Sequence, residues 1–397
     1  MGTKKLSENI YSVGVLNPGM RVFDIIMEAP YGTSYNAYLI TGEKNVLLDT
    51  VHLDYFGEYL ENIQSVVDVS KIDYLIMNHT EPDHSGSVAK LLELNPNLAV
   101  YCTMAAKKYL SAITNRDFQC HVIKNGETLE LGGRALRFIA APLLHWPDSM
   151  FTWDEKSGTL FTCDFLGTHF CEPTMMDTGV HYPDKYWEQF RHYYDCIFGP
   201  FKPYVLSGLD KIRDLPVKLV CPSHGPCLTS NIEKTQKLYR EWSAPQAREK
   251  KRAAVLYASA YGCTAQLARA AYEELKQDPN LEVSLIDIVY TPLEESVAAA
   301  NEADALLIGS CTINRDAPKI VWDVLSGIDA INVYRKSAGA FGAYGWSGEA
   351  VGMMKSRLEH LKYSFVGDGV RVNFTPTPSD LAQMKKYARS VADEIEP

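Results

Sequence analysis

The sequence predicts two α/β domains: a layered mixed domain of packed sheets covered by helices, followed by a doubly wound parallel sheet. The first supporting observation is length, because 397 residues suit two or three domains of about 150 residues each. The second is a change of composition near residue 246, where charged residues become dense. The third is the regular alternation of apolar strand-like runs and helix-period segments beyond that point, which is typical of a parallel sheet.

The first half contains short β-type runs interleaved with single helical segments, which predicts packed sheets under helices. We place this domain at residues 1–248. Its predicted strands are Ile10–Leu16, Arg21–Met27, Tyr38–Ile40, Asn45–Leu48, Ile72–Met77, Leu98–Cys102, Cys120–Ile123, Ala135–Ala140 and Thr159–Thr162. Its predicted helices are Phe56–Val66, Val88–Leu94 and Ala105–Ile113.

The stretch from Gln246 to Arg252 is dense in charge, so we interpret it as a solvated linker. The second domain then covers residues 253–397. Its predicted strands are Ala253–Ala258, Leu281–Ile288, Ala305–Gly309, Ala338–Ala343 and Phe365–Phe374. Its predicted helices are Gln266–Lys276, Val297–Asn301, Ile320–Leu325, Val351–Leu361 and Ser379–Glu394. In such a sheet, ligands bind beyond the carboxyl ends of the strands.

The overall charge and the cysteines exclude several classes of protein. Asp and Glu exceed Lys and Arg by 49 to 39, which argues against a nucleic-acid partner. No apolar run approaches the ~18 residues of a membrane span, and the polar first residues lack the apolar stretch of a signal peptide. The nine cysteines form no Cys-x-x-Cys pair, which fits reduced thiols better than a zinc ribbon. We therefore expect a soluble, cytoplasmic protein without a membrane or nucleic-acid partner.

A cluster of potential metal ligands follows the strand predicted at Ile72–Met77. His79, Glu81, Asp83 and His84 lie within six residues, and imidazole and carboxylate are ligands of divalent transition metals. In an extended stretch, alternate residues face the same way, so His79, Glu81 and Asp83 are expected to converge. His84 breaks the alternation and is free to serve a neighbouring metal.

Three further candidate ligands lie downstream, each at the end of a strand-like segment. They are His145, Asp164 and His224. Together with the first cluster they supply four histidines and three carboxylates. That number is enough for two metal ions that share a bridging ligand.

This half resembles the metallo-β-lactamase-like fold, an αββα sandwich whose usual signature is His-x-His-x-Asp-His. The departure is Glu81, which stands where the second histidine would be. The full arrangement resembles the flavodiiron protein family. The resemblance implies one iron on His79, Glu81 and His145, a second iron on Asp83, His84 and His224, and Asp164 as the bridge. The larger share of carboxylate favours iron or manganese, although ligand type alone leaves zinc open.

Three loops in the second half lie at the carboxyl ends of predicted strands and resemble those of flavodoxin. The first opens a helix, which makes it a ready site for an anion, and it lacks both a dinucleotide fingerprint and a P-loop lysine. The last carries aromatic residues suited to a flavin ring. The resemblance implies FMN, bound by Ser259-Ala260-Tyr261-Gly262-Cys263-Thr264, by Ser310-Cys311-Thr312-Ile313-Asn314 and by Ala343-Tyr344-Gly345-Trp346-Ser347-Gly348.

The two halves together predict an oxidoreductase. A flavin carries electrons, which a redox-active metal pair needs and a hydrolytic zinc pair does not. The family resemblance implies reduction of O2 to water, of NO to N2O, or of both, with electrons relayed through FMN. It also implies a separate electron donor, rubredoxin or a similar protein, or a reduced deazaflavin. A head-to-tail homodimer, or a dimer of such dimers, is implied in the same way.

Three residues are candidates for roles around the metals. His169 follows Asp164 by five residues, and we expect it to line the substrate pocket. Tyr193 or Tyr194 is expected to donate a proton or a hydrogen bond there.

Two other functions compete with this hypothesis. One is a zinc-dependent hydrolase with a flavodoxin-like regulatory domain, which Glu81 and the flavin loops disfavour. The other is a flavin-containing gas or redox sensor, which would need an output domain for which no residues remain. Metal and flavin content discriminate the first of these from the oxidoreductase.

Overall fold

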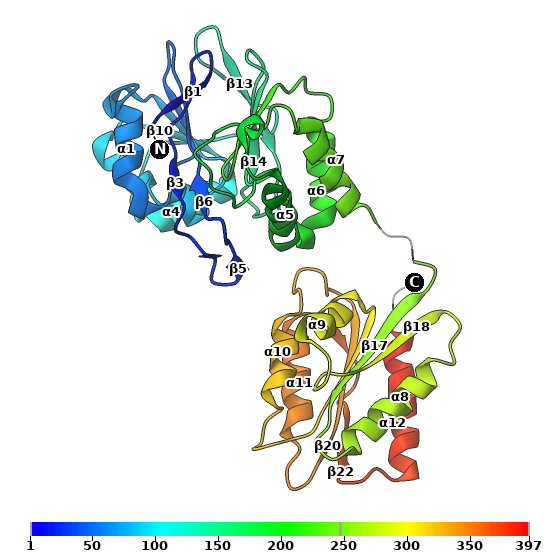
Figure 1. Cartoon of the computed structure of the whole chain (residues 1–397). Helices are drawn as coiled ribbons and strands as arrows, with labels where there is room; N and C mark the ends of the chain where they lie inside the picture. Colours follow the sequence, from blue (N-terminus) through cyan, green and yellow to red (C-terminus); the bar gives the residue numbers. More distant parts are fainter. Residues whose placement is uncertain (1, 246–247, 396–397) are drawn as a thin grey trace. The chain divides into compact units, whose positions relative to one another are not determined.

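The computed structural model describes residues 2–245 and 248–395, and its contacts divide the chain into two compact units after Pro245 (Figure 1). Gln246 and Ala247 of the predicted linker lie outside the described residues. The predicted end of the linker at Arg252 is wrong, because Lys251 and Arg252 already belong to a strand. Arg252 pairs with Glu282 across the sheet and donates to its carboxylate, so the charge belongs to a strand end.

The first unit contains two large sheets and two small two-stranded sheets. The larger sheet has seven strands, in the order β1 (Lys4–Ser7), β2 (Ile10–Ser12), β7 (Tyr38–Ile40), β8 (Val46–Leu48), β9 (Tyr74–Ile76), β10 (Ala99–Cys102) and β11 (Cys120–Val122). The smaller sheet has the order β12 (Thr128–Glu130), β13 (Ala135–Ala140), β14 (Met150–Asp154), β15 (Thr159–Cys163) and β16 (Leu219–Pro222). One small sheet pairs β3 (Val15–Asn17) with β6 (Thr33–Tyr35), and the other is the hairpin of β4 (Val22–Phe23) and β5 (Met27–Glu28).

Helices cover the outer face of each sheet, which gives four layers (Figure 1). The seven-stranded sheet is covered by α1 (Phe56–Gln64), α3 (Val88–Leu94) and α4 (Met104–Thr114). The five-stranded sheet is covered by α5 (Pro183–Tyr193), α6 (Lys202–Ile212) and α7 (Ile232–Ser243). The one-turn helix α2 (Pro82–Ser85) follows β9.

The layers follow from the direction of the side chains, which alternates between the two faces of a sheet along each strand. Leu39, Leu47 and Leu75 pack under the helices, whereas Ile40 and Leu48 pack between the two sheets. Strands buried on both faces therefore read as continuous apolar runs. The predicted αββα sandwich is confirmed.

The second unit is a parallel sheet with helices on both faces. Its strands are β17 (Lys251–Ala258), β18 (Leu281–Asp287), β19 (Ala305–Ser310), β20 (Ser337–Tyr344), β21 (Ser364–Phe365) and β22 (Val370–Asn373). The order is β18-β17-β19-β20, with β21 and β22 both beside β20. Helices α8 (Cys263–Leu275) and α12 (Pro378–Asp393) cover one face. Helices α9 (Leu293–Glu302), α10 (Lys319–Ser326) and α11 (Glu349–His360) cover the other, as predicted for a doubly wound sheet.

Two predicted strands are each split in the structure. The run Arg21–Met27 is the hairpin β4–β5, because Asp24 and Ile25 adopt left-handed backbone angles that reverse the chain. The run Phe365–Phe374 is divided into β21 and β22 by a turn with positive φ at Gly367 and Gly369. Helices α5 to α7 were not predicted, although their buried residues recur at the three- and four-residue spacing of a helix.

No helix among the described residues is both long enough and apolar enough to cross a bilayer.

Candidate metal centre and nucleotide pocket

All seven predicted metal ligands lie at one rim of the sandwich in the first unit. They come from the segment after β9, from α2, from the β13–β14 loop and from the ends of β15 and β16. Their donor atoms form two groups, in each of which the atoms lie within 4.8 Å of one another. The first group is His79, Glu81, His145 and Asp164, and the second is Asp83, His84 and His224.

The helical turn α2 corrects the expectation that the whole ligand stretch is extended. Glu81 has extended backbone angles, but Pro82 then starts a helix, since its fixed φ suits the first helical position. Asp83 is therefore turned away from His79 and Glu81 and lies in the second group with His84. The simple alternation of an extended chain put Asp83 in the wrong group.

In the first group, one carboxylate oxygen lies close to the nitrogen atoms of two imidazoles. Glu81 Oε2 lies 3.3 Å from His79 Nε2 and 3.1 Å from His145 Nε2. Both nitrogens also lie 3.7 Å from Asp164 Oδ2. Four side chains from three separate segments thus converge on one point with nitrogen and oxygen donors.

In the second group, Asp83 faces two imidazoles. Its Oδ1 lies 3.3 Å from His84 Nε2, and its Oδ2 lies 3.2 Å from His224 Nε2. Asp83 is buried, yet neither oxygen receives a hydrogen bond from any residue that the structure describes. A buried carboxylate without hydrogen bonds is costly, and a bound cation removes that cost.

Asp164 connects the two groups through its two oxygens. Oδ1 lies 3.1 Å from His84 Nε2 and 3.3 Å from His224 Nε2, whereas Oδ2 faces His79 and His145. The Tyr193 hydroxyl donates a hydrogen bond to Oδ1 at 3.1 Å. This arrangement gives each group one oxygen of a single buried carboxylate, as a bridging ligand requires.

The electrostatics of the cluster favour cations. Burial lowers the pKa of His84, but the carboxylates of Asp83 and Asp164 raise it to about 9. Burial also opposes the charged form of His79, yet the hydrogen bonds that it donates to Asp148 and Glu81 hold its pKa well above the usual range. The carboxylates thus keep positive charge at the site, and metal ions would take the place of these protons.

Asp148 supports the cluster from outside it, and the sequence did not single it out. Its two oxygens each lie 3.2 Å from His79 Nδ1, and Oδ2 accepts from the Thr80 backbone N–H at 2.8 Å and from its hydroxyl at 2.7 Å. A carboxylate behind an imidazole fixes the ring and strengthens it as a metal ligand. No motif marks such a residue, because it lies 69 positions along the chain from His79.

We expect Asp148→Ala to weaken metal binding by roughly 10- to 100-fold, because His79 loses the group that orients its ring. Competition with a chelator measures this loss. Asp148→Asn keeps one acceptor oxygen and should lose less affinity. Equal metal affinity in wild-type and Asp148→Ala protein would contradict the role.

His169 and Tyr193 lie at the cluster, whereas Tyr194 does not. The His169 ring lies 4.5 Å from that of His224 and 5.0 Å from that of Tyr193, and its Nδ1 lies 2.8 Å from the Thr33 hydroxyl. Burial and the neighbouring His224 lower the pKa of His169 well below the usual value, so this imidazole is neutral. The Tyr194 hydroxyl instead bonds to Ser243, so the expectation that it serves the metals is corrected to a core role.

A hollow of about 250 Å³ adjoins both groups of ligands, through Glu81 of the first and Asp83 of the second. The residues that line it include two predicted ligands and several that the sequence did not single out: Met20, Val22, Phe23, Asp24, Tyr35, His52, Glu81, Pro82 and Asp83. The β4–β5 hairpin contributes three of them. Their positions in the chain were the available signal, because Tyr35 ends the buried strand β6 and His52 follows the buried strand β8.

A second hollow, of about 290 Å³, lies at the carboxyl ends of the strands in the second unit. It is lined by Ser259, Ala260, Tyr261, Cys263, Thr264, Cys311, Thr312, Ile313, Ala343, Tyr344, Gly345 and Phe374. The other predicted loop residues do not line it: Gly262, Ser310, Asn314, Trp346, Ser347 and Gly348. The sequence missed Phe374, which follows β22 at the same edge.

The first loop of this hollow is shaped to hold an anion. Helix α8 begins at Cys263, and Gly262 before it has φ +82°, which a residue with a side chain rarely adopts. Ser259 Oγ accepts from the Ala265 N–H, and Thr264 Oγ1 accepts from the Ala343 N–H at 3.3 Å each. The free N–H groups of a helix N-terminus attract phosphate.

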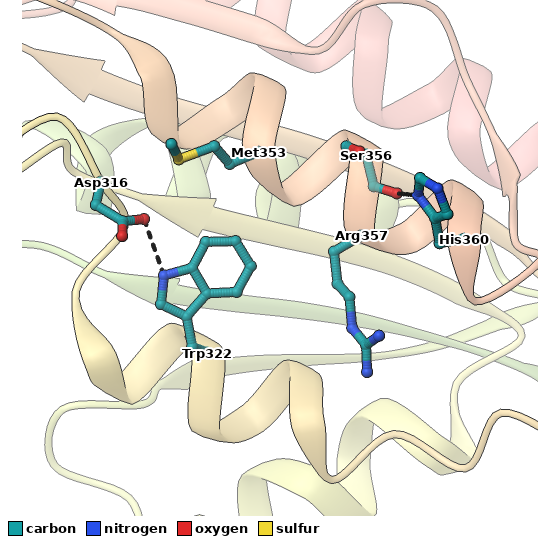
Figure 2. Close-up of a pocket in the computed structure, with 6 residues that line it drawn as sticks. All are labelled: Asp316, Trp322, Met353, Ser356, Arg357 and His360. Carbon is teal, nitrogen blue, oxygen red and sulfur yellow. Dashed lines mark hydrogen bonds between the residues drawn. The ribbon is translucent and has the colours of Figure 1, made fainter.

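A third hollow in the second unit lies between α10 and α11 (Figure 2). Its lining includes Asp316, Trp322 and His360, and it contains none of the predicted site residues. The Asp316 carboxylate accepts from the Trp322 indole at 2.9 Å, and His360 Nδ1 lies 2.6 Å from the Ser356 carbonyl (Figure 2). These polar groups are satisfied within the protein, unlike those of the metal cluster.

Comparisons with known proteins match both halves. Residues 33–225 match the model of the ODP family beta lactamase, and residues 255–387 match that of flavodoxin. The chain is 48% identical to flavo-diiron protein FprA2 of Clostridium acetobutylicum, over 98% of this chain and 99% of that protein. It is 34% identical to type A flavoprotein fprA of Rhodobacter capsulatus, over 99% of this chain and 92% of that protein.

Two solved structures are similar over the whole chain. One is the rubredoxin oxygen:oxidoreductase of Desulfovibrio gigas, with a TM-score of 0.67, 28% identity, and coverage of 99% of this chain and 98% of that one. The other is the flavodiiron protein of Giardia intestinalis, with a TM-score of 0.66, 25% identity, and coverage of 100% and 97%.

Proposed function

Because the chain belongs to the flavodiiron protein family, we propose that it reduces O2 to water, NO to N2O, or both, at a di-iron centre supplied with electrons by FMN. Membership in the family makes it an oxidoreductase with a metallo-β-lactamase-like domain and a flavodoxin domain. The observation that carries the proposal is Asp164, whose two oxygens each face a different pair of histidines.

The side chains that are present fit both cofactors. His79, Glu81 and His145 would hold one iron, and Asp83, His84 and His224 the other, with Asp164 between them. The buried oxygens of Asp83, which lack hydrogen-bond donors, support this assignment. In the second unit, the N-terminus of α8 would hold the FMN phosphate.

Tyr261, Tyr344 and Phe374 line the remainder of that hollow and would contact the flavin ring. These aromatic side chains offer a flat apolar surface, as a ring system requires. The pocket thus combines an anion site with an aromatic wall.

When bound, the two irons and FMN supply the redox chemistry, two electrons from each, which matches the four that O2 needs to become two waters. The chain's own residues position the metal ligands and line the site of the substrate. Tyr193 donates to Asp164 and holds the bridge in place. His169 is a neutral imidazole whose Nε2 has no partner among the described residues, so this nitrogen is free to form a hydrogen bond with a substrate.

Metal and flavin analysis tests the proposal against the zinc hydrolase. We expect two irons and one FMN per chain, with yellow colour that bleaches on reduction. Colourless protein with two zinc ions would support the hydrolase instead. Steady-state rates with O2 and with NO, measured with one reduced donor, then assign the substrate.

Rubredoxin or a similar small electron-transfer protein is the donor that we propose. The support is the printed name of the Desulfovibrio gigas relative, a rubredoxin oxygen:oxidoreductase. A reduced deazaflavin is the alternative donor. Reduction of bound FMN by each candidate, followed by flavin absorbance, separates the two.

We further propose that the chain works as a head-to-tail homodimer, or as a dimer of such dimers. Ile25 and Ile26, at the tip of the β4–β5 hairpin beside the metal hollow, are 94% and 89% exposed. Tyr261, which lines the nucleotide hollow, is also 94% exposed. Exposed apolar groups beside both sites fit a second copy that brings one site of each chain against the other site of its partner.

We expect the double variant Ile25→Asp, Ile26→Asp to shift the protein towards monomers and to slow turnover, with iron and FMN content unchanged. Sedimentation velocity over a range of concentrations measures the first effect. Met104→Asp, at an exposed position on α4, is the matched control and should leave the dimer intact. An unchanged dimer in the double variant would exclude this contact.

A further inference from the structure

Two thiols lie in contact at the edge of the seven-stranded sheet, outside the metal cluster. Cys102 ends β10 and Cys120 begins β11, and their sulfur atoms are 3.6 Å apart. Eighteen positions separate them in the chain, so no spacing motif marks the pair. The fold alone brings them together.

The environment of the pair makes the partly exposed thiol reactive and keeps the buried thiol protonated. Cys102 is fully buried, whereas Cys120 is partly exposed. The hydrogen bond with Cys102, together with the nearby Lys107 and His121, lowers the pKa of Cys120 to about 7. A large fraction of Cys120 is therefore thiolate at neutral pH, and the thiolate is the form that attacks oxidants.

The position of the pair allows the sulfur atoms to approach. A disulfide bond is about 2.05 Å long, so the two sulfurs must move closer by roughly 1.5 Å. β11 is the outermost strand of its sheet and pairs only with β10 among the described residues. A small shift of β11 therefore breaks no second strand pairing.

We propose that Cys102 and Cys120 form a reversible disulfide when the protein meets a hydroperoxide. The Cys120 thiolate attacks one oxygen of H2O2, which breaks the O–O bond and gives a sulfenic acid and hydroxide. The Cys102 thiol then displaces that oxygen as water and forms the S–S bond. In total, two thiols lose two hydrogens and two electrons, and one H2O2 becomes two waters; an added dithiol reverses the change.

The disulfide is connected to the metal cluster through two residues. Thr103 directly follows Cys102, and its hydroxyl donates to the Asp148 backbone carbonyl at 3.0 Å. Asp148 in turn holds His79. Oxidation that shifts Cys102 at the end of β10 as well as β11 therefore moves a support of a proposed iron ligand, and this second step rests on the proposed function.

Peptide mapping of the protein with its cofactors tests the pair directly. The protein is treated with increasing H2O2, blocked with iodoacetamide and digested with trypsin, which places Cys102 in peptide 91–107 and Cys120 in peptide 117–124. We expect a linked pair of these peptides, lighter than their sum by two hydrogens, that disappears after dithiothreitol. It should form at a lower peroxide concentration than any oxidation of the exposed Cys196.

Two variants complete the test. Cys120→Ser should abolish the link, whereas the matched Cys196→Ser should form it as the wild type does. Oxidation of Cys196 while the pair stays reduced would overturn the proposal, and so would separate over-oxidation of the two thiols. Because this readout needs no turnover, its failure is distinct from failure of the proposed function.

Turnover tests the connection to His79. Peroxide should lower the rate of the wild-type protein reversibly, and Cys120→Ser should keep its rate. A linked pair with an unchanged rate would overturn the connection and leave the disulfide itself standing.

Discussion

Asp164→Ala is expected to lose at least one iron and to lower turnover by roughly a hundredfold or more, with FMN still bound. Asp164 is buried, and each of its oxygens faces two of the four histidines. Its removal therefore takes a ligand from both groups and leaves crowded imidazoles without the carboxylate that stabilises their charge. Metal analysis and steady-state rates measure the two effects.

The control for this variant is Asp195→Ala, which removes a carboxylate from a surface pair with Arg191 in the same unit. An exposed pair of this kind contributes little to stability, so iron, FMN and turnover should stay at wild-type values. If Asp164→Ala kept both irons and normal turnover, the assignment of the bridge would be wrong. Bound FMN in both variants shows that the second unit is intact.

Ala260→Asp is expected to weaken FMN binding by about a hundredfold and to leave the iron content unchanged. Ala260 lines the nucleotide hollow at the loop that precedes α8. Two negative charges about 5 Å apart repel by roughly 3 kcal/mol at an effective dielectric constant of 20, so a carboxylate beside the phosphate site would oppose binding. The fold should tolerate the change, because acidic residues are favourable near a helix N-terminus.

Ala260→Asn is the matched control, since its side chain has nearly the same shape without the charge. It should lose far less affinity than Ala260→Asp. Flavin absorbance after gel filtration measures retained FMN, and excess FMN should restore turnover to the charged variant. Equal FMN retention in the two variants would place the phosphate elsewhere.

The two variants separate the proposed sites. Asp164→Ala removes iron and keeps flavin, whereas Ala260→Asp removes flavin and keeps iron. Loss of both cofactors from either variant would indicate unfolding of the chain.

Much of the fold was predictable because its elements are regular. Val88–Leu94 and Tyr38–Ile40 were predicted at the bounds that α3 and β7 have. The period of two or of 3.6 residues is a local property, so it can be read without any contact. The hairpin at Asp24 and Ile25 was missed because an apolar sequence there adopts left-handed backbone angles, which favour other residues.

The candidate site was predictable to the extent that its residues follow strands. His145, Asp164 and His224 were singled out for that reason, and the structure brings them together with His79 and His84. Gly262 is different: it was predicted to bind the flavin, but it shapes the loop from outside the hollow.

The sequence by itself determined the chemical types of the donors, the alternation of strands and helices in the second unit and the two-domain plan, because these depend on residues close together in the chain. Only the tertiary structure decided that each oxygen of Asp164 faces a different histidine pair, that Asp148 supports His79, and that Cys102 meets Cys120. Such contacts join distant positions. They exist only once whole layers have packed, and no local pattern records them.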